Sequence, residues 1–147
     1  MIGLIALAVV LFLVISALLA RVFSVGGAEN SALTALVRAE ARGDAGGVIA
    51  LVDGCARTAA CRARATQVSA ALRHPGTVSI AEINASAGFS LGTTVGTARV
   101  AWLAGGSLPR VQCVRVRHAG DVLQGFTVQL LAVSARIGTG RDCPARF

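Results

Sequence analysis

Residues 39–55 read AEARGDAGGVIALVDGC, and the Gly43-Asp44 pair inside this stretch separates two predicted helices. The residues before it, 30–42, place leucine, valine and alanine on one helical stripe, and glycine is the residue most typical of a helix C-terminus. Asp44 can cap the helix that follows, over about 45–53. A third helix is expected from about 59 to 72, ahead of a Pro-Gly pair.

The composition and residue pattern of the sequence change from residue 77 on. Four stretches are rich in β-branched residues, alternate roughly in hydrophobicity and are bounded by Gly, Pro or Asp. They predict four strands, within 77–89, 96–106, 109–120 and 122–138. AGGSLP at 104–109 is expected to join the middle two strands, and HAGD at 118–121 to form the turn between the last two. Connections this short make consecutive strands antiparallel. We therefore predict an α+β domain with three helices packed on one face of a four-stranded antiparallel sheet.

This order of elements, together with AEARGDAGGVIALVDGC, resembles the nuclear transport factor 2-like (cystatin-like) superfamily over about residues 29–143. The chain is similar to single-pass envelope proteins of actinobacteria that carry such a domain, with residues 111–137 as the last hairpin. The resemblance implies that the sheet is strongly bent. Enzymes of the family, such as ketosteroid isomerase and scytalone dehydratase, use Asp, Tyr or His as acid and base. This chain has no tyrosine, and no acidic residue matches a catalytic position, so no catalytic residue is carried over.

The N-terminal run Ile2–Ala20, IGLIALAVVLFLVISALLA, contains no charged residue. As a helix it would reach about 28 Å, near the thickness of the hydrocarbon layer. We expect residues 1–23 to be a transmembrane anchor that inserts Ile2–Ala20 into the lipid bilayer, with an uncleaved signal as the alternative. Residues 24–28 would form a connector, and 29–147 the α+β domain.

The four cysteines all follow the apolar run, and their even number is typical of disulfides in an oxidising compartment. This outweighs the weak charge signal of Arg21, which favours a cytoplasmic location for the residues after it. We therefore expect an extracytoplasmic domain on a cell membrane protein. Local pairing gives Cys55–Cys61 and Cys113–Cys143, although the sequence alone leaves three connectivities open. The spacings do not suit zinc, and neither a metal nor another cofactor is predicted.

All 14 basic residues are arginines, and the formal net charge is +7. Such a charge attracts acidic polymers and anionic lipid headgroups. Aromatic residues make up only 4% of the chain, so the stacking platform of a nucleic-acid-binding surface is missing, and nucleic acid is not an expected partner. Arg115 and Arg117 share a strand face with Cys113 by alternation, which indicates a solvated or partner-facing surface.

Two hypotheses about function follow. The first is a non-catalytic, membrane-anchored interaction or scaffold domain of the bacterial envelope, binding an envelope protein or its own copy. The second is a domain that binds a small molecule or lipid, or acts like an isomerase, in a pocket between helices and sheet. Leu36, Trp102 and Phe126 would line that pocket, and Glu82 would be its general base if it faced inward. A filled interior would favour the first hypothesis. A pseudopilin is the third alternative. This chain lacks the pattern that a prepilin requires, a glycine followed five residues on by a glutamate.

Overall fold

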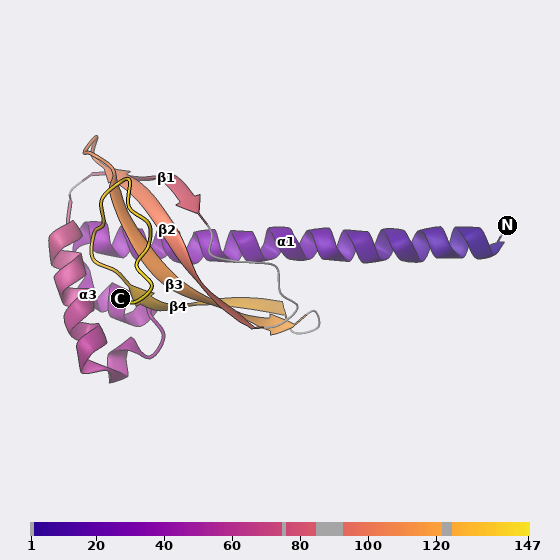
Figure 1. Cartoon of the computed structure of the whole chain (residues 1–147), viewed down its shortest axis with the longest axis horizontal. Coiled ribbons are helices and arrows are strands. Elements are labelled where there is room, and N and C mark those ends of the chain that lie inside the picture. The colour runs from indigo at the N-terminus through magenta and orange to yellow at the C-terminus, as the bar shows by residue number, and fades with distance from the viewer. Residues whose placement is uncertain (1, 75, 85–92, 122–124) are drawn as a thin grey trace.

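The computed structural model describes residues 2–74, 76–84, 93–121 and 125–147. It is an α+β fold in which helices lie against one face of a four-stranded sheet (Figure 1). The elements are α1 (Ile2–Arg42), α2 (Ala45–Leu51), the 3-10 turn η1 (Cys55–Arg57), α3 (Ala59–Leu72), β1 (Val78–Asn84), β2 (Thr94–Ala104), β3 (Arg110–Asp121) and β4 (Gly125–Val133).

The sheet has the order β1-β2-β3-β4, and every neighbouring pair is antiparallel, as predicted. The connection at 104–109 is also confirmed, since β2 ends at Ala104 and β3 begins at Arg110. The turn predicted at 118–121 is wrong, because these residues continue β3 and pair with the start of β4. The physical reason is that His118 alternates in phase with Val114 and Val116 and is buried on the inner face of the sheet.

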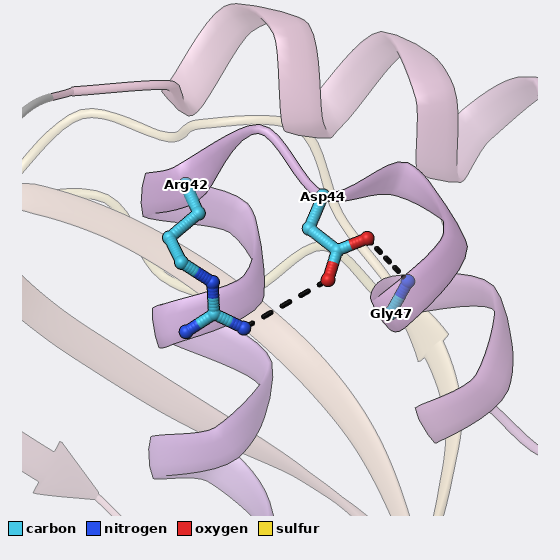
Figure 2. A network of polar contacts seen from close by, with 3 residues as sticks. All are labelled: Arg42, Asp44 and Gly47. Atoms are coloured by element: carbon cyan, nitrogen blue, oxygen red, sulfur yellow. Dashed lines mark hydrogen bonds and ion pairs between the residues drawn. The ribbon is translucent and has the colours of Figure 1, made fainter.

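The junction between α1 and α2 forms as the Gly-Asp pair predicts. Gly43 has φ +73°, a left-handed conformation that ends α1. The amide of Gly43 donates to the carbonyl of Glu40, and the amide of Asp44 donates to that of Ala39, which is a Schellman motif. Figure 2 shows the Asp44 carboxylate between two partners: it accepts from the Gly47 amide at 2.8 Å and lies 3.8 Å from a nitrogen of Arg42. This turn folds α2 back beside the end of α1.

One apolar cluster fills the space between the helices and the inner face of the sheet. Its largest members are Trp102 of β2 and Leu33, Leu36 and Leu72 of the helices, each 1% exposed or less. The inner face of the sheet follows the alternation of β2 and β3, which contribute Ala98, Val100, Trp102, Ala104, Val114 and Val116 to the cluster.

The C-terminal tail crosses the opposite face of the sheet. Ile137 pairs with Val111, and Cys143 is bonded to Cys113. Arg99 and Arg115, which alternation places on the outer face, donate to backbone carbonyls of the tail at Thr139 and Ala145. Arg115, one of the two arginines that indicated a partner-facing surface, therefore holds the chain's own tail.

The prediction of a transmembrane helix at Ile2–Ala20 is wrong. Over the residues that the structure describes, no helix combines the length and the apolar character needed to cross a membrane. The apolar run is not a separate segment, because it is the first part of α1, a 41-residue helix whose second part carries charged residues and packs on the sheet. The described large apolar side chains of the first part are 47–68% exposed, with Leu7 and Phe12 the most exposed, and this part extends away from the body in Figure 1.

Helix α1 also runs without a break through residues 24–28, where the sequence led us to expect a connector. A glycine inside a helix costs about 1 kcal/mol relative to alanine. Extension of an existing helix needs no new nucleus, so the two glycines at 26 and 27 do not suffice to end it. The predicted α+β domain therefore begins in the middle of α1.

Candidate functional site

The structure describes the side chains of two of the three residues predicted to line a pocket between helices and sheet, and both lie in the core. Leu36 and Trp102 have no exposed surface and belong to the packed apolar cluster. The guanidinium carbon of Arg110 lies 5.6 Å from the centre of the Trp102 ring. Phe126 belongs to β4, but its side chain lies outside the described part of the chain. The described interior is thus filled by side chains where the pocket was expected.

Glu82, the candidate general base, points out of the fold. Its side chain is 54% exposed and lies 3.6 Å from a guanidinium nitrogen of Arg99 on the neighbouring strand. A register shift between Ile80 and Glu82 interrupts the alternation of β1 at this point. A side chain this exposed lacks the desolvation that raises the pKa of a buried general base.

A surface cleft of about 700 Å³ lies where α1 and α3 end. Two of its walls come from the last turns of α1 and from the segment that links α3 to β1. Its lining consists of Arg38, Ala41, Arg42, Arg73, His74, Gly76, Thr77 and Val78. No lining residue is acidic, and every charged one is an arginine.

Local structure accounts for the convergence of these arginines. Arg38 and Arg42 are four residues apart on α1 and share one face of the helix. Arg73 is the residue that caps α3. A β-carbon added at Gly43 would come within 2.9 Å of the Arg73 side chain, so the arginine chain lies directly against the glycine that ends α1. The amide of His74 donates to the carbonyl of Ala41 at 2.9 Å, and this contact joins the two helix ends.

His74 has a defined hydrogen-bonding role in the cleft wall. A guanidinium nitrogen of Arg110 lies 3.3 Å from Nδ1 of its ring. Because a guanidinium can only donate, Nδ1 accepts and the hydrogen of the neutral ring is on Nε2. The arginines of the cleft can therefore only donate, and the His74 ring has its donor at Nε2.

Two buried polar contacts, which the sequence analysis missed, join α1 to β3. Gln112 Nε2 donates to Glu40 Oε2 at 2.5 Å, and His118 Nε2 lies 2.9 Å from Glu29 Oε2. All four side chains are buried. Burial raises the pKa of Glu40 from its ordinary value of 4.5 to about 7, and the hydrogen bond from Gln112 opposes this in part. These groups lie in the packed layer and do not line the cleft.

The sequence does hold a signal for these contacts. Glu29 and Glu40 fall at the two ends of the helical stripe that contains Leu33 and Leu36. Gln112 and His118 stand at the ends of the alternating inward positions of β3, on either side of two valines. A polar residue in an apolar stripe needs a buried hydrogen-bonding partner. Each stripe has a polar residue at either end, which can pair with a polar residue of the other stripe.

Both predicted disulfides are confirmed. Cys55 and Cys61, with Cα atoms 5.1 Å apart, tie η1 to the first turns of α3. Cys113 and Cys143, with Cα atoms 5.7 Å apart, tie β3 to the tail.

No protein-family model, curated protein or solved structure matches this chain. The resemblance to the nuclear transport factor 2-like superfamily therefore stays a prediction, and the proposals below rest on the chain's own residues.

Proposed function

We propose that this protein is a non-catalytic interaction domain that recognises its partner at its surface, at the cleft where α1 and α3 end. The observation that carries the proposal is the complete burial of Leu36 and Trp102 in one packed cluster. A domain that holds a small molecule between helices and sheet needs an apolar cavity there. In the described part of this chain, side chains fill that layer around Leu36 and Trp102, and Glu82 lies outside it.

The two disulfides support a location outside the reducing cytoplasm. Structural disulfides persist in secreted and envelope proteins, whereas cytosolic thiols are kept reduced. All four cysteines of the chain are paired. A location in the bacterial cell envelope agrees with this chemistry, and binding to an envelope component is the form of interaction that we propose.

Site-specific photo-crosslinking in the native host tests this function. A photoreactive amino acid is placed in the full chain at Thr77, on the cleft wall, at Val95, on the exposed outer face of β2, or at Trp102, in the interior. We expect a discrete covalent adduct at position 77 and none at 95 or 102. A small-molecule adduct at position 102 would support the internal pocket instead. Absence of an adduct at 77 under conditions in which the chain is folded and oxidised would also contradict the proposal.

A further inference from the structure

We propose that the cleft binds a phosphoryl group, held by Arg38, Arg42 and Arg73 together with the ring of His74. This inference rests on the proposed surface function and names the chemistry that the surface recognises. It is independent of the identity of the rest of the ligand.

The first argument is the imbalance of charge at the cleft. The guanidinium groups of Arg38, Arg42 and Arg73 line it, and that of Arg110 lies behind His74. The opposing charge comes from Asp44 and from the C-terminal ends of α1 and α3, each of which is equivalent to about half a negative charge. The three arginines that line the cleft already outnumber these roughly two negative charges, and Arg110 adds a fourth positive charge nearby, so the cleft retains a positive charge that an anion can neutralise.

The second argument is that the existing negative groups are already engaged. Asp44 lies 3.8 Å from Arg42, a loose contact, and uses its other oxygen to cap α2. The last carbonyls of α1 accept hydrogen bonds from the amides of Gly43, Asp44 and His74. Each of these carbonyls has already used one of its two lone pairs, which leaves fewer acceptors for the donors of Arg38 and Arg73.

The third argument concerns the shape of the ligand group. Guanidinium groups bind phosphate oxygens with pairs of parallel hydrogen bonds. Arginines that approach from two helices suit a tetrahedral group, whose oxygens point in different directions, better than a planar carboxylate. A volume of about 700 Å³ exceeds the size of a phosphate, so the cleft has room for a phosphate ester as well as for the free ion.

Calorimetric titration of the full, oxidised chain tests the proposal. The chain is kept in nonionic detergent, because the first part of α1 exposes apolar side chains. The probes are inorganic phosphate and glycerol 3-phosphate, with sulfate and chloride at equal ionic strength as controls. The cleft variant is Arg38→Gln/Arg73→Gln. Its matched control is Arg57→Gln/Arg64→Gln, which removes the same charge at exposed positions outside the cleft lining.

We expect saturable binding of at least one phosphoryl probe, weakened at least about tenfold in the cleft variant and by less than about twofold in the control. Binding of both probes would indicate that the free ion suffices, and binding of the ester alone that the glycerol moiety is also recognised. Equal weakening in both variants would show non-specific attraction and overturn the proposal. Absence of binding, while a crosslink still forms at position 77, would overturn the phosphoryl assignment and leave the interaction function standing.

Discussion

At the scale of single residues, the most consequential feature is the pairing of buried polar groups between α1 and β3. Glu29 meets His118, and Glu40 meets Gln112, with apolar side chains between the two contacts. A slip of α1 along the sheet would leave a buried carboxyl group without its partner, which costs several kcal/mol. We infer that the two contacts fix the position of α1 more than they increase stability.

Glu40 makes the stability of the fold depend on pH. Its pKa is about 7 in the folded chain and near 4.5 when unfolded, so the folded chain binds more protons between these values. The free energy of unfolding therefore falls as pH rises from 4.5 to 7, and the penalty is complete above 7. We expect Glu40→Gln to be more stable than the wild type by about 3 kcal/mol at pH 8, and by little at pH 4. Urea unfolding at a series of pH values measures the difference, and parallel curves for the two proteins would refute it.

The contact between His118 and Glu29 predicts a different pattern. His118→Ala leaves the buried carboxyl group of Glu29 without its hydrogen-bonding partner and is expected to destabilise the fold by about 1–3 kcal/mol or more. Replacing both residues by leucine removes the unpaired group and should recover much of that loss. Thermal unfolding of the two variants gives the comparison. A double variant no more stable than His118→Ala would argue against desolvation as the cause.

At the scale of elements, a glycine inside α1 and the glycine directly after it have opposite roles. Gly43 ends the helix with φ +73°, and an added β-carbon would press on Arg73. We expect Gly43→Ala to destabilise the fold by about 1–2 kcal/mol. Gly27 lies inside the helix with open space around it, so Gly27→Ala should raise helix content and stability by up to about 1 kcal/mol. Circular dichroism with thermal unfolding distinguishes the two, and the same sign for both would contradict this assignment.

The two disulfides are expected to contribute unequally. On the chain-entropy account the 30-residue separation of Cys113 and Cys143 gives about 3–4 kcal/mol, and the 6-residue separation of Cys55 and Cys61 about 2. Serine pairs at each bridge, compared by denaturant unfolding, test the order. Backbone contacts such as Ile137 with Val111 also hold the tail. A larger loss at the shorter bridge would show that local geometry, and not loop length, decides.

The elements differ in how far the sequence predicts them. The end of α1, α2, α3 and the order of the strands follow from Gly43, Asp44 and simple alternation, because these signals are local. The start of α1 does not, since two glycines inside a long helix resemble a linker. The inward position of His118 depends on where β3 ends, and the outward position of Glu82 depends on a register shift in β1. The cleft was missed for a related reason, because its arginines come from different elements that only the fold brings together.

At the scale of the whole molecule, one face of the sheet is closed by helices and part of the other by the chain's own tail. The helical layer is filled by Leu36 and Trp102, and the tail covers Val111 and Cys113 on the outer face. The open, charged concavity lies at the edge, where α1 and α3 end. We therefore propose that the interior, closed over the residues that the structure describes, holds no ligand and that recognition takes place at the surface.

The most direct test of this claim is a titration with a small apolar probe such as benzene, followed by the fluorescence of Trp102, the single tryptophan of the chain. Leu36→Ala provides a positive control, because it opens a cavity in the same layer at a cost of about 2–5 kcal/mol. We predict a saturable change in fluorescence for Leu36→Ala and none for the wild type. A saturable change of similar size in the wild type would show an internal binding cavity and contradict the account.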